Sequence, residues 1–353
     1  MRRVALIDLD ALQALRRAGE FEAARTQLIA AIEAEPEDPE LRLELGHTCR
    51  LIGDFVTAEQ AYADAWAWFE ADDDPVGTID AMLGLASVYR ATGAYSGALG
   101  LLDEAKELID AIEDRESLPH WYWTRGTLLR YSGQLREAEI ELRVGLDLAR
   151  ELEDTESEAY LLAALGGLMR VRGEFAASAE FYERAYIAFE AIEDAFGLAY
   201  TACGRANAAR MQGDFGTAER YFAEAAERYE TFGDKVSYAY TLWAWAVLAT
   251  LQGEPASAAE RLDKAAALFA ETGDRRGQAY VELARAQLQV QDGRLPEDER
   301  VTLRECAAQW SQRGLPFEAA VASYMADPSD AHRARISELG SAWEPDSLPL
   351  NIP

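Results

Sequence analysis

The chain has 353 residues, 49% of them hydrophobic and 27% charged, which is typical of a folded soluble protein. Its 63 acidic residues outnumber the 34 basic ones and give a formal net charge of −29. Because nucleic-acid backbones and anionic membranes both bind net positive faces, this charge argues against either partner. A single compact core of this length would be large, so we expect two domains or an array of repeats.

The first residues, MRRVALIDLD, include basic side chains, but their apolar run ends at Leu6–Ile7, before Asp8. This is not the pattern of a signal peptide, and no run of about 18 apolar residues predicts a membrane span. Cysteines occupy only three scattered positions, which argues against a disulfide framework or a thiolate metal site: Cys49, Cys203 and Cys306. We therefore expect a cytoplasmic protein.

Up to Gly293 the sequence is a repeat, and glycines mark its period. The first interval is 34 residues and each later one is 40, with glycines at positions 19, 53, 93, 133, 173, 213, 253 and 293. Aspartates keep the same 40-residue spacing at positions 74, 114, 154, 194, 234 and 274. The residues between an aspartate and the next glycine have helical apolar spacing, as in Leu161, Leu165 and Met169. Glycine suits the left-handed end of a helix and aspartate the start of the next, so each unit predicts a pair of helices.

The residues around these glycines resemble the tetratricopeptide repeat, whose pattern is L-G-x2-Y-x3-G-x4-A-x3-F/Y-x2-A. One unit matches with Leu45, Gly46, Cys49, Gly53, Ala58, Tyr62 and Ala65, and the next with Leu85, Ala86, Tyr89, Gly93, Ala98, Leu102 and Ala105. The 40-residue units resemble the longer variant found in bacterial peptide-sensing regulators and eukaryotic polarity adaptors. The resemblance implies an all-α fold, a right-handed superhelical α-solenoid of about eight helix-turn-helix repeats in residues 1–293. The repeats are expected near 4–36, 37–74, 75–114, 115–154, 155–194, 195–234, 235–274 and 275–312.

The repeat register fails after Gly293, where Pro296 and Asp298 stand at positions that the repeat gives to other residues. Helices are still predicted over 296–312, 316–326 and 329–339. Because a solenoid end must cover its apolar face, we interpret 294–353 as a helical C-terminal cap with an irregular tail. The tail, SAWEPDSLPLNIP, could instead be a linear motif for another protein or a disordered segment.

In tetratricopeptide solenoids the first helix of each repeat lines a concave groove, and the resemblance implies which positions face it. Three residues before the glycine, six successive repeats carry an arginine; we call Arg16, Arg50, Arg90, Arg130, Arg170 and Arg210 the arginine row. Other inward positions carry aromatic side chains, namely Trp123, Trp243, Tyr160, Tyr200, Tyr240 and Tyr280. Asn207 stands where related solenoids often place an asparagine that holds a peptide backbone. The predicted groove is basic over six repeats and becomes apolar and aromatic in the last two.

These side chains also have a purely structural interpretation. An arginine in the last turn of a helix interacts favourably with the helix dipole and can pair with a glutamate of a neighbouring helix. The tyrosines could pack between repeats. On the functional side, a row of guanidinium groups is a local exception in so acidic a chain, and guanidinium forks suit carboxylates and backbone carbonyls. Both interpretations stay open at this point.

The sequence contains no catalytic, nucleotide-binding or metal-site motif that we recognise. The histidines at 47, 120 and 332 share no ligand spacing, and the pair Cys203 and Asn207 lacks a histidine that would activate the thiol. We therefore expect no catalytic residue, no cofactor and no metal. The favoured function is a non-enzymatic interaction module or scaffold whose groove binds a peptide or protein segment, expected to be acidic or carboxylate-bearing.

The main alternative is a ligand-responsive regulator. In that case a signalling peptide or an anionic small molecule would change the superhelix, which would then act through a partner protein. A catalytic protein that uses the groove as a substrate bed is a third and weaker alternative. The oligomeric state is open, with a monomer slightly favoured because an acidic surface opposes self-association.

Overall fold

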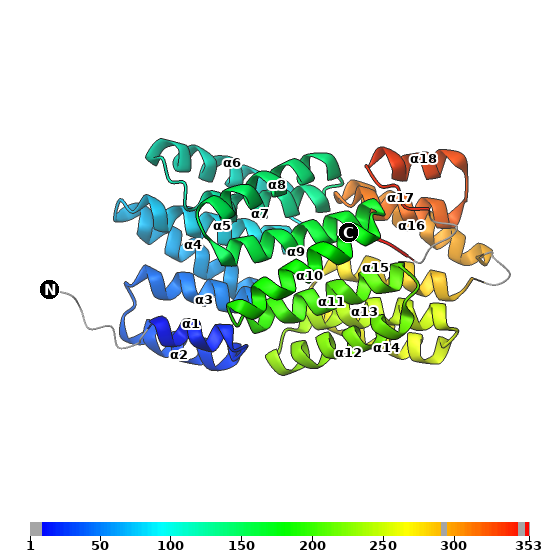
Figure 1. The fold of residues 1–353 in the computed structure, drawn as a ribbon, viewed down its shortest axis with the longest axis horizontal. Coiled ribbons are helices and arrows are strands. Elements are labelled where there is room, and N and C mark those ends of the chain that lie inside the picture. Colours follow the sequence, from blue (N-terminus) through cyan, green and yellow to red (C-terminus); the bar gives the residue numbers. More distant parts are fainter. Residues whose placement is uncertain (1–8, 291–294, 345–349, 353) are drawn as a thin grey trace.

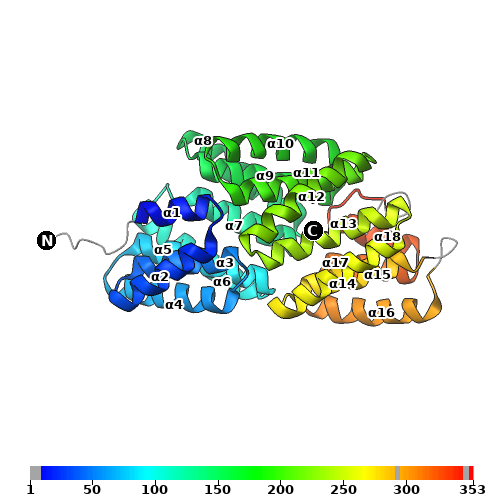
Figure 2. The ribbon, with the colours of Figure 1, turned by 90° about the horizontal axis from the view of Figure 1, so that it is seen from below.

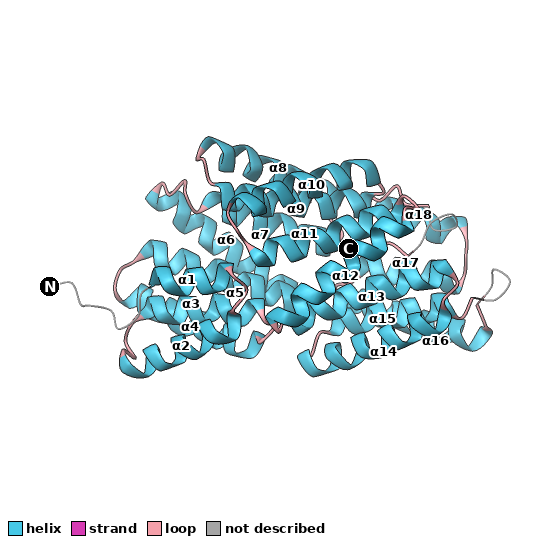
Figure 3. Ribbon diagram, turned by 60° about the horizontal axis from the view of Figure 1, so that its bottom comes forward, coloured by secondary structure: helices cyan, strands magenta, loops and turns pink. Residues whose placement is uncertain are grey.

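The computed structural model describes residues 9–290, 295–344 and 350–352. Throughout these ranges the regular elements are α-helices joined by short turns (Figure 3), as the sequence predicts. In chain order they are α1 (Leu9–Arg17), α2 (Phe21–Ala34), α3 (Pro39–Leu51), α4 (Phe55–Ala71), α5 (Pro75–Thr92), α6 (Tyr95–Ile112), α7 (Leu118–Tyr131), α8 (Leu135–Glu151), α9 (Thr155–Arg172), α10 (Phe175–Ala191), α11 (Ala195–Met211), α12 (Phe215–Phe232), α13 (Lys235–Gln252), α14 (Pro255–Thr272), α15 (Arg275–Leu288), α16 (Glu297–Gln312), α17 (Pro316–Ala326) and α18 (Asp330–Glu338). None of the helices described is long and apolar enough to cross a membrane.

The helices up to α14 pack in successive pairs, and each pair also packs on the next (Figure 1). The solenoid predicted from the repeat is therefore confirmed. The expected start of the first repeat near residue 4 lies outside the described residues.

The repeating glycines and aspartates do end and begin helices. Gly93 ends α5 with φ 83°, a left-handed conformation that glycine adopts without strain. Asp194 begins α11, and its side chain accepts a hydrogen bond from the backbone N–H of Gly197 at 2.8 Å. That bond satisfies one of the donors that the first turn of a helix leaves free.

Glycines inside the first helices admit aromatic rings from the second helices. The ring of Tyr62, on α4, lies between Gly46 of α3 and Gly84 of α5. A Cβ on Gly46 would lie 2.8 Å from the ring, and one on Gly84 would lie 2.2 Å from it. Each such ring fills the space between two successive first helices, so it ties neighbouring repeats together.

The superhelix closes on itself at its N-terminal end. The ring of Phe21, on α2, lies edge-on to Phe232 at 5.7 Å and to Phe196 at 6.3 Å, on α12 and α11. A Cβ on Gly53 would lie 2.7 Å from the side chain of Val236, on α13. The first two helix pairs therefore contact the sixth pair and the start of the seventh.

A second closure involves the C-terminal helices, which lie where the sequence predicts them. Helix α16 packs mainly on α17 rather than on α15. Gly133 lies in the turn between α7 and α8. A Cβ on it would lie 3.2 Å from Pro316, at the start of α17, and 3.2 Å from Leu339, just after α18. These helices thus also reach back to the middle of the solenoid, where a Cβ on Gly340, just after α18, would lie 3.2 Å from Leu135 at the start of α8. The division into a solenoid and a cap at residue 293 stays a prediction.

The chain beyond α18 runs back to the end of α9 (Figures 1 and 2). The Ser341 hydroxyl donates to the backbone carbonyl of Val171 at 2.6 Å, and the Ala342 N–H donates to that of Arg172 at 2.8 Å. Residues 350–352, which we call the C-terminal segment, are almost completely buried. The interpretation of the tail as part of a cap, a linear motif or a disordered segment stays a prediction, and residues 345–349 and 353 lie outside the described residues.

Candidate functional site

The inner faces of the first helices line a cavity of about 620 Å³ inside the closed superhelix. Twelve of the thirteen predicted groove residues line it: Arg16, Arg50, Arg90, Arg130, Arg170, Asn207, Trp123, Trp243, Tyr160, Tyr200, Tyr240 and Tyr280. Arg210 is the exception. The family geometry therefore places the inward positions well, but lining the cavity does not by itself give a side chain a role in binding.

Four arginines of the row line the cavity without a carboxylate partner among the described residues, and three of them, Arg50, Arg90 and Arg130, also lack the contacts with the C-terminal segment that Arg170 makes. Arg50, Arg90 and Arg130 have no carboxylate within 4 Å among the described residues, although Arg50 Nε donates to the Tyr62 hydroxyl at 3.4 Å. The Arg90 guanidinium lies 5.7 Å from the Trp123 ring centre. Arg130 is only 4% exposed. A buried cation without a counter-charge, as Arg130 is among the described residues, is costly for the fold.

The Tyr131 ring is the meeting point of these cations. The guanidinium carbons of Arg90, Arg130 and Arg276 lie 5.5, 4.7 and 4.0 Å from its centre. Burial disfavours the phenolate, but the three positive charges outweigh it and lower the pKa of Tyr131 to about 8. The three guanidinium groups thus make the potential around the Tyr131 ring positive.

Two other cavity arginines already have carboxylate partners. Arg16 forms an ion pair with Glu44 of α3, as the structural interpretation expects. Arg276, on α15, forms a buried ion pair with Glu318 of α17, with Nη2 at 2.6 Å from Oε1. Sequence reasoning missed Arg276 because it lies outside the repeating columns and its partner comes from beyond the repeats.

The predicted tyrosines take part in contacts between repeats. The Tyr160 hydroxyl donates to Asp194 at 3.1 Å, and the Tyr240 hydroxyl donates to Asp274 at 3.0 Å. Burial first, and then the carboxylate of Asp194, raises the pKa of Tyr160 well above its ordinary value. The two hydrogen bonds are equivalent: Tyr160 and Tyr240 are 80 residues apart, and each donates to the aspartate that begins the next repeat. For Tyr160 and Tyr240 the structure thus shows the packing role, together with a place in the cavity wall.

The other predicted site residues are held firmly by the chain itself. Trp243 is 5% exposed, and its indole N–H donates to the backbone carbonyl of Tyr280 at 2.8 Å. The Asn207 amide donates to the carbonyl of Cys203, on its own helix, at 3.0 Å. Burial raises the pKa of the Cys203 thiol, so no thiolate forms there near neutral pH.

The cavity histidines are neutral at pH 7. Burial, followed by the charge of Arg50, lowers the pKa of His120 to about 4. The pKa of His47 is also well below its ordinary value, chiefly through burial, and its Nδ1 lies 2.8 Å from the Tyr62 hydroxyl. No group of three metal-binding side chains occurs in the part of the chain that the structure describes.

The last two arginines of the row contact the C-terminal segment. Arg170 Nη1 donates to the Asn351 side-chain oxygen at 2.8 Å and to the Ile352 carbonyl at 2.9 Å. Arg210 donates to the Leu350 carbonyl at 3.3 Å and is 1% exposed. Arg210 therefore does not line the cavity, because the chain's own C-terminal segment covers it. The only sequence signal for this contact is an asparagine between two apolar residues near the end of the tail.

Comparisons with known proteins agree with this architecture. Residues 7–48 match the family model of the tetratricopeptide repeat, and no curated protein matches the sequence. The crystal structure of a Rap protein complexed with competence and sporulation factor superposes with a TM-score of 0.60 at 14% identity, over 94% of this chain and 98% of that one. NprR in complex with its cognate peptide NprX gives 0.59 at 13% identity, over 94% and 96%. The apo form of the quorum sensor NprR from B. thuringiensis gives 0.53 at 13% identity, over 94% and 97%.

Proposed function

Since this chain is a tetratricopeptide-repeat protein, we propose that it is a non-enzymatic binding module that takes up a carboxylate-bearing peptide or protein segment in its cavity. The observation that carries the proposal is a set of three cavity arginines, Arg50, Arg90 and Arg130, that have neither a carboxylate partner nor a contact with the C-terminal segment among the described residues. A bound carboxylate would supply the missing counter-charge, and guanidinium forks bind carboxylates with two parallel hydrogen bonds.

The size and lining of the cavity support a short ligand. Small-ligand sites usually measure about 300–1,000 Å³ and combine an apolar wall with a few placed polar groups. A cavity of about 620 Å³ fits a short peptide or the end of a chain better than a folded domain. Trp123 and the tyrosines would give such a ligand aromatic faces beside the cations. The peptide complexes among the structural neighbours are consistent with a ligand of this class.

The proposal can be tested with a displayed library of short random peptides. We expect the wild-type protein to enrich peptides with Asp, Glu or a free C-terminal carboxylate. Replacing Arg90→Gln and Arg130→Gln together should weaken the selected peptide about tenfold or more, since a hydrogen bond to a charged group contributes about 1.5–3 kcal/mol. Arg143→Gln is the matched control, because Arg143 lies on α8 outside the cavity lining. Peptides without carboxylate enrichment, or equal affinity for the double variant, would refute the proposal.

The two closures favour the ligand-responsive regulator as a second candidate function. Contacts such as Phe21 with Phe232 and Arg276 with Glu318 join distant turns of the superhelix, so a ligand that binds between these turns would strengthen or break them. Small-angle scattering with and without the selected peptide separates the two functions. A passive scaffold would keep its radius of gyration, whereas a switch would change it and would pass the change to a partner protein.

A further inference from the structure

The C-terminal segment lies at the Arg170 and Arg210 end of the arginine row, away from Arg90 and Arg130 along the chain of repeats. Its three residues are buried, with Leu350 3% exposed and both Asn351 and Ile352 fully covered. Backbone polar groups are rarely buried outside regular structure unless they find partners. Here the partners are the arginines of two successive first helices.

The contacts of Asn351 use both sides of its amide. Its side-chain oxygen accepts from Arg170 Nη1 at 2.8 Å, while its side-chain nitrogen donates to the backbone carbonyl of Arg170 at 3.0 Å. No other uncharged side chain of similar size offers a donor and an acceptor in this arrangement except glutamine, which is longer by a methylene. Arg170 thus binds the Asn351 side chain with both its guanidinium group and its backbone carbonyl.

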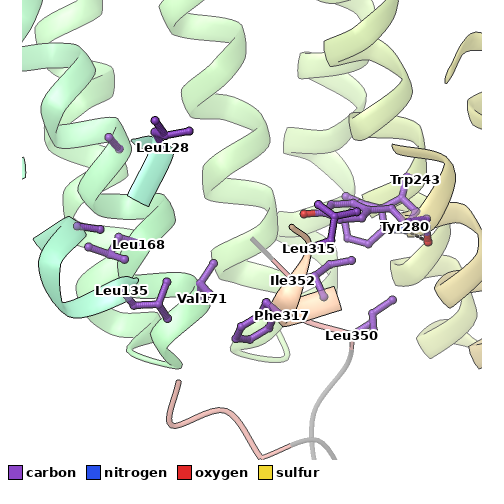
Figure 4. Close-up of a cluster of buried hydrophobic side chains, with 14 of the residues drawn as sticks. Leu128, Leu135, Leu168, Val171, Trp243, Tyr280, Leu315, Phe317, Leu350 and Ile352 are labelled. Carbon is purple, nitrogen blue, oxygen red and sulfur yellow. Dashed lines mark hydrogen bonds between the residues drawn. The ribbon is translucent and has the colours of Figure 1, made fainter. Parts of the chain in front are cut away.

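The neighbouring residues supply main-chain acceptors and apolar side chains. Arg170 also holds the Ile352 carbonyl at 2.9 Å, and Arg210 holds the Leu350 carbonyl at 3.3 Å. The side chains of Leu350 and Ile352 belong to the same buried cluster as Trp243, Tyr280, Leu315 and Phe317 (Figure 4). Main-chain hydrogen bonds combined with pockets for alternate side chains are how grooves recognise extended peptides.

We propose that this end of the groove is a recognition site for an extended apolar–Asn–apolar peptide segment, which the chain fills with its own residues 350–352. A segment of another protein with the same pattern is the partner that displaces it. The inference rests on the proposed function in so far as the inner face binds peptides, but it concerns different arginines. Because the C-terminal segment is part of the same chain, its effective concentration at the site is high. A competing partner must therefore bind with higher affinity, or be present at higher concentration, to displace it.

The test uses a fluorescent peptide with the sequence of residues 347–353, SLPLNIP, and measures binding by anisotropy. A chain that ends at Glu344 should bind this peptide, and the full chain should bind it about tenfold or more weakly because its own segment competes. The peptide SLPLAIP should bind the shortened chain about tenfold more weakly, since it loses both hydrogen bonds to Arg170. A folded shortened chain that does not bind SLPLNIP, or equal binding by both chains, would overturn the inference.

A second measurement covers the case in which the shortened chain does not fold. A protease site placed within residues 345–349 of the full chain allows the segment to be cut after folding. The cut segment should then exchange with an excess of labelled SLPLNIP, whereas a segment that stays bound without exchange would show a permanent structural element and would refute the inference.

Arginine variants of the cut protein separate this inference from the proposed function. Arg210→Gln, at a residue that contacts Leu350 but does not line the cavity, should weaken exchange of SLPLNIP and leave binding of the selected acidic peptide unchanged. Arg90→Gln with Arg130→Gln should do the reverse. If only the acidic peptide fails to bind, the proposed function is wrong and the recognition site at Arg170 stands.

Discussion

Two parts of the arginine row occupy equivalent positions in successive repeats and have different surroundings. Arg90 and Arg130 face the cavity beside the Tyr131 ring, without carboxylate partners among the described residues. Arg170 and Arg210, one and two repeats further on, donate to oxygens of the C-terminal segment. The repeat therefore determines the position of each arginine, whereas the C-terminal segment, which lies outside the repeats, determines which of them already have partners.

The largest effect is expected where a cation of the cavity does have a partner. Glu318→Ala would leave Arg276 buried and unpaired, and removing one member of a buried ion pair costs about 3–5 kcal/mol. Arg130→Met, which removes a cation without a carboxylate partner in the described part of the chain, should cost much less or should stabilise the fold. Urea denaturation of both variants measures the difference. Equal losses would show that Arg130 is balanced by charges that the ion-pair geometry does not reveal.

A second prediction concerns the titration of Tyr131. Its folded pKa of about 8 lies below the ordinary value of 10.0, so the folded state gains stability as pH rises from about 8 to 10. The free energy of unfolding of wild type minus Tyr131→Phe should grow by about 2–3 kcal/mol over this window. In Arg90→Gln with Arg130→Gln, near-ultraviolet titration should show the pKa of Tyr131 moving back up. An unchanged titration would mean that these arginines do not create the positive potential.

A third prediction concerns the space that Arg130 occupies. A Cβ on Gly167, on α9, would lie 2.0 Å from Arg130 Nη1, so Gly167→Ala should displace the guanidinium and cost about 1–3 kcal/mol. Gly100→Ala is the matched control: it lies in α6 with open space around it, and alanine there should stabilise the helix by up to about 1 kcal/mol. Thermal unfolding compares the two. If Gly167→Ala is as stable as the control, the Arg130 side chain moves aside freely.

The smallest effect on stability is expected where the C-terminal segment contacts Arg170 and Arg210. Asn351→Ala removes two buried hydrogen bonds to Arg170 and should cost about 1–2 kcal/mol of unfolding free energy. Hydrogen exchange should show faster exchange at the amide of Ala342, which donates to the Arg172 carbonyl, and unchanged exchange in α5. A loss spread evenly over all helices would contradict a local role for the segment.

The sequence predicts the helices well because their signals are local. Helix α16, for example, begins one residue from its expected start even though the repeat has failed there, since apolar spacing and Pro296 suffice to define it. The inward positions follow from the period together with the solenoid geometry that the family resemblance implies. The closures, the ion pair of Arg276 with Glu318 and the burial of Arg210 could not be predicted, because each joins residues far apart in the chain that share no repeated signal.

The contact of Phe21 with Phe196 and Phe232 changes how this solenoid should unfold. In an open array each repeat touches only its neighbours, so stability is close to a sum over adjacent units and the ends fray independently. Here the first repeat is also a neighbour of the sixth, which converts a linear chain of coupled units into a loop. Unfolding should accordingly be more cooperative than in an open array of the same length. Deleting the first repeat would expose apolar surface on α11 and α12, which lie in the middle of the sequence.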